Sequence, residues 1–295
     1  MASLGLSKFV NEDKTFNYEK LHEVTKIVVS NLNKVIDINF YPTEKTRRSN
    51  YLHRPIGLGV QGLADVFAMM DIAFHSDEAK EINKNIFETI YHAAVERSCE
   101  IAQERKEGMI QLLKWYHKDQ WGFKNKEGQC RTYIFESQES RRLLQEEHKI
   151  IIDYLSTFKP TFDEITKLQE YCIGSYSSFI GSPISQGIFK FDMWNVSPSD
   201  RYDWDTLRVN ITQQGLRNSL LIAPMPTAST SQILGNNECF EPFTSNLYVR
   251  RTLAGEFVCI NKHLQKELTE MKAKIERLEE LLSQKGINLS KLKLK

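Results

Sequence analysis

Apolar residues recur at helical spacing in two segments of the first third of the chain. The first segment, residues 14–40, is predicted to be a helix, and the second helix is predicted from Asp77 to about Arg105. Ser76 precedes the second helix as an N-cap, with acidic residues in the first turn. One face of each helix carries the apolar positions, which are Leu21, Val24, Ile27, Val28, Leu32, Val35 and Ile36, then Ala79, Ile82, Ile86, Ile90, Ala94 and Ile101. Residues 41–55 are polar and contain two prolines, so we expect a loop there.

The pattern changes at about residue 106. Residues 106–173 are rich in aromatic side chains, and we expect a strand at Cys130–Phe135, a helix at Ser140–Phe158 and a shorter helix after Pro160. Residues 174–263 return to short apolar runs between turns. The predicted strands in that part are Gly187–Phe191, Leu220–Ala223 and Glu256–Ile260.

A heptad pattern marks the end of the chain. Apolar residues step by alternating intervals of four and three, with charged residues at most other positions. The stripe consists of Leu264, Leu268, Met271, Ile275, Leu278 and Leu282. Two interpretations are open, an amphipathic helix docked on its own domain and a helix that binds a second copy or a partner.

Composition narrows the class of protein. The 295 residues are 41% hydrophobic and 26% charged, with a formal net charge of +1, which indicates a globular chain and favours neither nucleic acid nor membrane as a partner. No apolar run approaches the roughly 18 residues of a membrane span, and no signal peptide is evident. Five widely spaced cysteines without a CxxC pair exclude a disulfide framework and a sequence-evident zinc site, and they suit a reducing, cytoplasmic location. We expect packing roles for Cys99, Cys239 and Cys259.

Gly57, Gly59 and Gly62 fit the G-x-G-x-x-G spacing of dinucleotide-binding loops. Such a loop needs an acidic residue about 20 positions later, at the end of a second strand. The corresponding stretch here, at Ser76–Glu78, is the start of a predicted helix. We therefore favour close packing of a strand against a helix over nucleotide binding as the role of these glycines.

A second candidate motif follows the predicted strand Leu220–Ala223. The strand runs into Pro224–Ser231, which is rich in small hydroxyl residues, and then into a helical stretch at Gln232–Leu234. Hydroxyls and free backbone N–H groups at a strand-to-helix turn bind phosphate without needing a lysine. The alternative is a plain cluster of N-capping residues.

A long pattern runs without a gap from Trp204 to Pro226. It reads W-x2-L-x7-G-L-R-N-x3-I-A-x2-P and is complete, at Trp204, Leu207, Gly215, Leu216, Arg217, Asn218, Ile222, Ala223 and Pro226. By this pattern the chain resembles the large, catalytic subunit of class I ribonucleotide reductase in its eukaryotic and viral form. Other stretches similar to the family are Arg54–Asp65, Gly181–Gly187, Phe191–Asn195, Ile233–Glu238 and Glu241–Asn246. The resemblance covers about residues 2–105 and 174–270.

The resemblance implies an α/β fold, as part of a ten-stranded α/β barrel, and the conversion of ribonucleoside diphosphates to deoxyribonucleoside diphosphates for DNA synthesis. The substrate diphosphate would bind at Pro226, Thr227, Ala228, Ser229 and Thr230. The family draws its radical from a metal-containing small subunit, so no cofactor is expected in this chain. Expected partners are the ribonucleoside diphosphate, that small subunit and the missing part of the large subunit, with a homo-oligomer through residues 264–282 as an additional expectation.

The parts of the chain that do not resemble the family determine the expected domains and the hypotheses about function. We expect a partial barrel over residues 1–105 and 174–263, an inserted α+β segment at 106–173, and a heptad helix with a basic tail at 264–295. The radical cysteine and its redox partners would lie outside the matched stretches, so no catalytic residue is assigned. The first hypothesis is a large-subunit fragment that works with a partner chain carrying the radical cysteine. The alternatives are a non-catalytic interaction module that uses the insertion and the heptad helix, or a degenerate frame that never folds.

Overall fold

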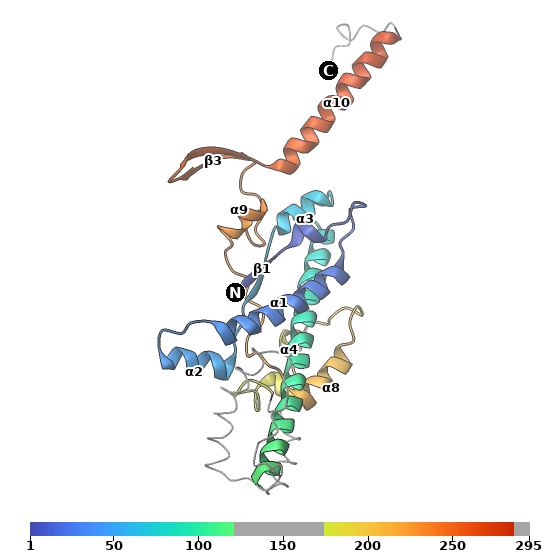
Figure 1. The fold of residues 1–295 in the computed structure, drawn as a ribbon. Helices are drawn as coiled ribbons and strands as arrows, with labels where there is room; N and C mark the ends of the chain where they lie inside the picture. The colour runs from blue at the N-terminus through green and yellow to red at the C-terminus, as the bar shows by residue number, and fades with distance from the viewer. Residues whose placement is uncertain (121–173, 286–295) are drawn as a thin grey trace, which may run out of the picture. The chain divides into compact units, whose positions relative to one another are not determined.

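The computed structural model describes residues 1–120 and 174–285, with only the backbone described for 109–120 (Figure 1). The chain divides into two compact units. The first comprises Met1–Leu4, Asn17–Gly59 and Ile82–Pro224, and the second comprises Gly5–Phe16, Val60–Glu81 and Met225–Lys295. The elements predicted at Cys130–Phe135, at Ser140–Phe158 and after Pro160 lie outside the described residues.

Helix α1, Tyr18–Ile38, confirms the first predicted helix. Asn17 caps it by accepting a hydrogen bond from the Lys20 N–H at 2.9 Å. Its buried face is narrower than the apolar pattern suggested, because Ile27 and Val35 are 58% and 49% exposed. The residues that do pack inward are Leu21, Thr25, Val29, Leu32, Asn33 and Ile36.

Helix α2, Glu44–His53, occupies most of the stretch that the sequence predicted as a loop, so that prediction was wrong. Thr43 and Thr46 form a capping box at its start. Arg54 ends the helix in the left-handed conformation, with φ of 45°. Pro42 and Pro55 lie just outside the two ends of the helix, so neither proline interrupts it.

Helix α4, Asp77–Gln120, confirms the second predicted helix but extends 15 residues past the predicted end at Arg105. Ser76 caps it through a hydrogen bond from the Ala79 N–H at 3.1 Å. The predicted boundary between the barrel part and the inserted segment, at 105/106, therefore falls inside a continuous helix. The proposed domain limits remain a prediction.

The core of the first unit lies where α1, α4 and α8, Trp204–Gln214, meet (Figure 1). Trp204, Leu207 and Ile211 of α8 pack there with residues of the other two helices. The strand predicted at Gly187–Phe191 is absent: a short 3-10 helix, Pro183–Gln186, ends at Gly187 with φ of 75°, and α7, Lys190–Met193, follows. The apolar run was wrongly assigned to a strand because Phe189 is buried in a helix–helix core, with 0% exposure.

Two small sheets are present among the described residues, and they form no closed barrel. Strand β1, Ala2–Gly5, pairs with β2, Leu58–Gln61, and β3, Leu247–Thr252, pairs antiparallel with β4, Gly255–Ile260. The predicted strand Glu256–Ile260 is thus confirmed. The predicted strand Leu220–Ala223 appears as an extended segment beside β2, with a parallel bridge between Leu58 and Ile222.

Glycines allow two of these close approaches. A Cβ at Gly57 would lie 3.2 Å from the Ala223 Cβ, so the glycine lets the segments meet. Gly62, with φ of 80°, begins α3, Leu63–Met69, and packs against Asn236. Both glycines therefore allow close packing, but against an extended segment and against Asn236, and not in the strand–helix contact that the sequence predicted.

A buried polar network centred on Asn218 holds the first unit together. The Asn218 amide exchanges hydrogen bonds with the Asn33 amide at 3.0 and 3.1 Å, and its Nδ2 also donates to the Arg54 carbonyl at 2.8 Å. Ser98 of α4 donates to the Asn218 Oδ1 at 3.0 Å. Arg54 pairs with Asp37 at 2.6 Å and donates to the Asn33 carbonyl at 2.9 Å. The network fixes the segment that leads into Leu220–Ala223.

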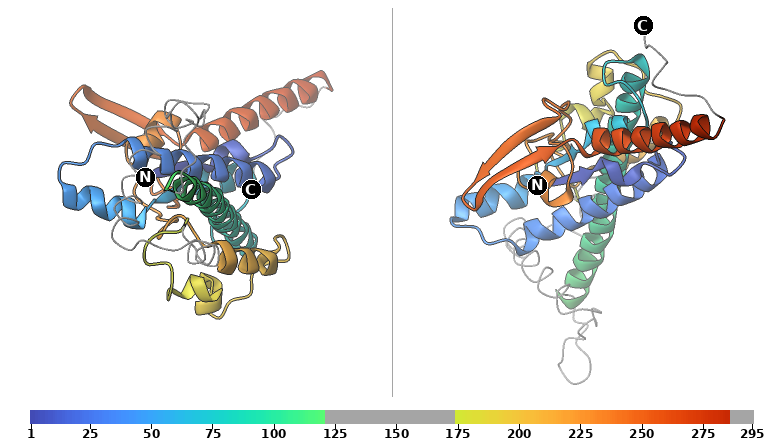
Figure 2. Two further views of the ribbon diagram at one scale, coloured as in Figure 1. Left: turned by 60° about the horizontal axis from the view of Figure 1, so that its bottom comes forward. Right: turned by 90° about the horizontal axis from the view of Figure 1, so that it is seen from above.

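The second unit ends in helix α10, Lys262–Gln284, which Figure 2 shows as an uninterrupted helix following the β3–β4 hairpin. Its heptad residues Leu268, Met271, Ile275 and Leu278 are 51–58% exposed. The interpretation of α10 as a helix docked along this stripe is therefore not supported by the described residues.

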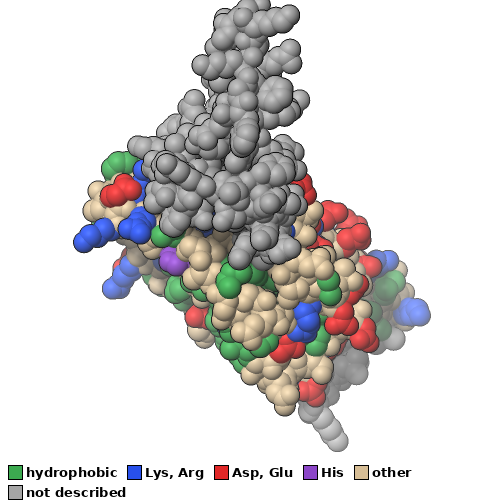
Figure 3. Space-filling model, turned by 90° about the horizontal axis from the view of Figure 1, so that it is seen from below, with side chains coloured by type: hydrophobic (Ala, Val, Ile, Leu, Met, Phe, Trp, Pro, Cys, Tyr) green, Lys and Arg blue, Asp and Glu red, His purple; other side chains and the backbone are tan. Residues whose placement is uncertain are grey.

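The distribution of surface charge and the polarity of the helices match what the composition predicted. The face drawn in Figure 3 intersperses acidic, basic and apolar side chains, in keeping with the formal net charge of +1. Among the described residues, every helix is too short or too polar to cross a membrane.

Candidate functional site

The loop Pro226–Thr230 leads into α9, Thr230–Leu234, which confirms the helical stretch predicted there. The loop has a buried part and an exposed part. The side chain of Thr227 is buried, with 4% exposure, whereas Pro226, Ala228, Ser229 and Thr230 are exposed. The five candidate residues therefore do not play equal roles.

Thr227 anchors the loop within the second unit. Its Oγ1 accepts a hydrogen bond from the Cys239 N–H at 2.9 Å, and its carbonyl accepts one from the Ser231 N–H at 2.9 Å. The Cys239 thiol contacts the Met225 carbonyl, and burial raises the pKa of this thiol. Cys239 is therefore a protonated packing residue, as its position in the sequence suggested.

Ser229 and Thr230 lie at the exposed end of the loop, where the Thr230 hydroxyl donates a long hydrogen bond of 3.5 Å to the Thr227 carbonyl. Ser229 occupies the N-cap position of α9 but makes no side-chain capping hydrogen bond, which argues against the plain N-cap alternative. The Ser231 N–H donates to the Thr227 carbonyl within the turn. The N–H groups of Ala228, Ser229 and Thr230 come before this first hydrogen bond of the helix. Two hydroxyls and several N–H groups thus gather where an anion can reach them.

Asp65 of α3 secures the segment that follows α9. Its Oδ2 accepts from the Asn237 N–H at 2.6 Å, and its Oδ1 lies 2.8 Å from the His263 Nε2 and 3.2 Å from the Lys262 Nζ. Burial raises the pKa of Asp65, but these hydrogen bonds and the charge of Lys262 outweigh it and leave the pKa below the ordinary value. The carboxylate therefore stays ionised and ties α3, the 236–239 turn and the start of α10 together.

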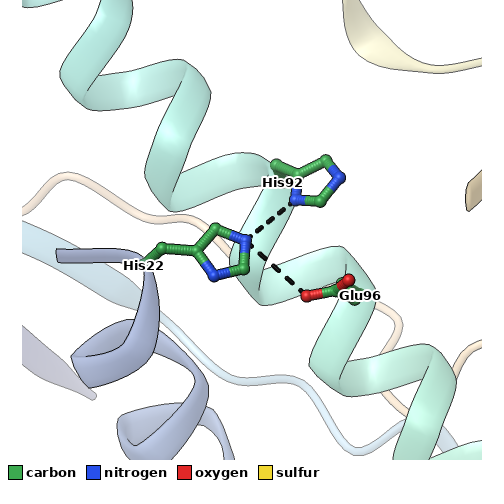
Figure 4. Close-up of side chains that lie close together, drawn as sticks. All are labelled: His22, His92 and Glu96. Atoms are coloured by element: carbon green, nitrogen blue, oxygen red, sulfur yellow. Dashed lines mark hydrogen bonds and ion pairs between the residues drawn. The ribbon is translucent and has the colours of Figure 1, made fainter. Parts of the chain in front are cut away.

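A second cluster of chemically capable side chains lies in the first unit, where α1 crosses α4 (Figure 4). His22 Nε2 lies 2.9 Å from His92 Nδ1 and 3.6 Å from Glu96 Oε2. Burial lowers the pKa of His92 to about 4 and also lowers the pKa of His22. The sequence analysis missed this cluster, although the four-residue spacing of His92 and Glu96 on one helix face was a usable signal.

The first unit also contains an apolar cavity of about 720 Å³. Tyr91 of α4, Trp204 of α8 and Trp194 line it, together with part of the Leu220–Ala223 segment. Trp194 is 71% exposed, so one wall of the cavity is open to solvent. The Phe191–Asn195 stretch singled out in the sequence therefore belongs to an apolar surface and not to the hydroxyl-rich loop.

Comparison with known proteins places the whole chain in one family. The family model described as ribonucleotide reductase, barrel domain, matches residues 1–294. The ribonucleoside-diphosphate reductase large chain of Neurospora crassa is 44% identical over 272 residues, covering 92% of this chain and 22% of that protein. The large subunits of Caenorhabditis elegans and Arabidopsis thaliana are 43% and 42% identical over 270 and 290 residues, covering 92% of this chain and 26% and 27% of those proteins. The chain thus spans about a quarter of the length of these curated relatives.

Proposed function

Because the chain belongs to the ribonucleotide reductase barrel-domain family, we propose that it supplies the substrate-diphosphate loop of a ribonucleoside-diphosphate reductase large subunit. The loop is Pro226–Thr230. The observation that carries the proposal is the exposed Ser229, which stands at the start of α9 and leaves its hydroxyl unused in capping. The family match extends over this loop and over the segments that hold it.

In this proposal the loop residues have different roles in binding the diphosphate. Ser229 and Thr230 donate from their hydroxyls, and the loop N–H groups donate alongside them. Thr227 keeps the turn in shape through its hydrogen bond from the Cys239 N–H. The small side chain of Ala228 lets the phosphates approach the backbone closely, and the ring of Pro226 fixes the backbone at the start of the loop.

The remaining parts of the reaction come from elsewhere in the assembly. We propose that this chain works with the part of the large subunit that carries the radical cysteine, and with a small subunit that generates the radical. The ten-stranded barrel is completed by that other part, with residues 106–173 as an insertion. The product, a deoxyribonucleoside diphosphate, feeds DNA synthesis in the cytoplasm. No cofactor is assigned to this chain.

Isothermal titration with a ribonucleoside diphosphate, and with the matching nucleoside as a reference, tests the loop. Hydrogen bonds to charged groups are worth about 1.5–3 kcal/mol, so Ser229→Ala and Thr230→Ala should each weaken diphosphate binding by roughly tenfold or more. Thr269→Ala, which removes an exposed hydroxyl on α10, is the matched control and should bind as the unaltered chain does. Equal affinity for nucleoside and diphosphate would refute the proposal.

A second function is favoured by α10. We propose that it pairs in parallel with a second copy of itself as a two-stranded coiled coil. The seam is the apolar stripe from Leu264 to Leu282, with Ile275 near its middle. Among the described residues, no other element covers the exposed part of this stripe. Glu267 and Lys272, and likewise Lys274 and Glu279, stand at positions that face each other between parallel helices, so both pairs attract.

Sedimentation equilibrium tests this pairing. The unaltered chain should show a monomer–dimer equilibrium, and Ile275→Asp should abolish the dimer because it places a charge in the seam. Val209→Asp, at an apolar α8 residue with 52% exposure, is the control and should dimerise normally. A chain that stays monomeric at all concentrations would exclude the coiled coil.

A further inference from the structure

The geometry points to a binding site for a divalent transition-metal ion of the zinc type, formed by His22 of α1 with His92 and Glu96 of α4. This site lies wholly inside the first unit and is separate from the diphosphate loop. It would tie α1 to α4 at the point where the two helices cross. Figure 4 shows the three side chains converging from the two helices.

The distances fit coordination by one ion. One ligand atom from each residue lies within 4.8 Å of the others, with 2.9 Å between the two ring nitrogens and 3.6 Å from His22 Nε2 to Glu96 Oε2. Ligands bound to zinc at about 2.0–2.2 Å in tetrahedral geometry stand roughly 3.3 Å apart, which lies between these two separations. Small side-chain adjustments would therefore admit an ion without moving the helices.

The donor set selects the kind of ion. Two imidazoles and one carboxylate suit zinc and its first-row neighbours, whereas magnesium and calcium prefer oxygen ligands. Metal ligation needs an unprotonated nitrogen on each imidazole, and the 2.9 Å contact between His22 Nε2 and His92 Nδ1 leaves room for at most one proton between these two nitrogens. Three protein ligands leave a fourth position for water or another ligand.

The surroundings hold the ligands in place. Tyr202 stacks on the ring of His92 with centroids 4.4 Å apart, and Trp204 meets the same ring edge-on at 4.9 Å. Tyr202 also stacks on His22. These aromatic contacts restrict the rotation of both imidazoles and shield one side of the cluster from water.

Lys26 is the cation that now neighbours the carboxylate. Its ammonium lies 3.0 Å from Glu96 Oε2 and also contacts Glu100. Glu100 therefore gives Lys26 a second partner, so Glu96 can turn to an ion while Lys26 keeps an ion pair. The competing arrangement is a metal-free hydrogen bond between the two histidines, and the experiment below separates the two.

The test is titration of the chelator-treated full chain with Zn²⁺, followed by calorimetry and by the midpoint of thermal unfolding. We expect one ion per chain and an upward shift of the midpoint. His22→Gln and His92→Gln should each weaken binding at least tenfold, and Glu96→Gln should weaken it measurably. His75→Gln, at an exposed histidine outside the cluster, is the matched control and should leave binding unchanged.

Three outcomes would overturn the inference. Absence of Zn²⁺ binding would leave the histidine hydrogen bond as the whole role of the cluster. Equal binding by the unaltered chain and His22→Gln, the variant at the less buried histidine, would place the ion elsewhere even if His92→Gln failed to fold. A sulfur-to-metal charge-transfer band with Co²⁺ would show that cysteines bind the ion. A Co²⁺ spectrum without that band, lost in His22→Gln, would support the site.

Discussion

Replacing Arg54 with alanine should destabilise the first unit severely. The Arg54 side chain is 1% exposed and makes an ion pair of 2.6 Å with Asp37, whose side chain is 11% exposed. It also donates from Nη2 to the Asn33 carbonyl at 2.9 Å and from Nε to the Asn33 Oδ1 at 3.3 Å. The alanine variant would leave a buried carboxylate without its counter-charge and would remove one donor from each of two Asn33 oxygens, of which Oδ1 keeps its hydrogen bond from the Asn218 amide.

The magnitude follows from the burial of this pair. Removing one partner of a buried ion pair costs about 3–5 kcal/mol, a large part of the roughly 5–15 kcal/mol that stabilises an ordinary domain. Arg251, by contrast, pairs with Glu256 where the side chains are 81% and 60% exposed. Arg251→Ala should therefore cost at most about 1 kcal/mol and serves as the matched control.

Urea unfolding followed by tryptophan fluorescence measures both variants, because Trp204 lies in the core of the first unit with 5% exposure. Substituting both partners, as Arg54→Met with Asp37→Leu, should cost less than Arg54→Ala alone, since no buried charge is left unpaired. The reasoning would be refuted if Arg54→Ala lowered the free energy of unfolding by no more than Arg251→Ala does. The reasoning would also be refuted if the double variant lost as much unfolding free energy as Arg54→Met and Asp37→Leu lose together when each is made alone.

Three further predictions concern the histidine cluster, the loop and the start of α3. The pKa of His92 falls from 6.5 to about 4 on folding, so the unfolded chain takes up its proton first as the pH drops. Stability should therefore fall by about 3 kcal/mol between pH 6.5 and pH 4, and His92→Phe should flatten this part of a pH series of urea midpoints. Thr227→Val leaves the buried Cys239 N–H without an acceptor, so unfolding should become easier by about 1–3 kcal/mol and that amide should exchange faster with deuterium. Gly62→Ala forces a side chain to φ of 80° and brings its Cβ to 3.2 Å from Asn236, so a loss of about 1–2 kcal/mol is expected by thermal unfolding, and no loss would contradict the packing argument.

Elements with strong periodicity could be predicted from the sequence, and those shaped by local caps or distant partners could not. The helices at α1 and α4 follow from apolar spacing and clear N-caps, Asn17 and Ser76. Helix α2 was missed because its prolines suggested a loop, while the Thr43–Thr46 capping box carried the opposite signal. The wrong strand at Gly187–Phe191 shows that a short apolar run cannot distinguish a strand from buried irregular structure.

The site was predictable in part for the same reason. The position of the hydroxyl-rich loop follows from local sequence, and its burial pattern does not. Thr227 is buried because the Cys239 N–H, 12 residues on, reaches its hydroxyl. Asn218 meets Asn33 across 185 residues, and His22 meets His92 across 70. Such pairings depend on how α1 packs on α4, which no local pattern specifies.

The central claim is that residues 226–230 bind the diphosphate of a ribonucleotide, and amide NMR of the ¹⁵N-labelled chain during titration with a ribonucleoside diphosphate tests it most directly. The account predicts saturable shifts concentrated at the amides of Ala228, Ser229, Thr230 and Ser231, with much smaller shifts in the Ser229→Ala variant. Inorganic diphosphate should perturb the same amides, and the free nucleoside should not. Shifts that are absent from this loop, or that persist unchanged in Ser229→Ala, would contradict the account.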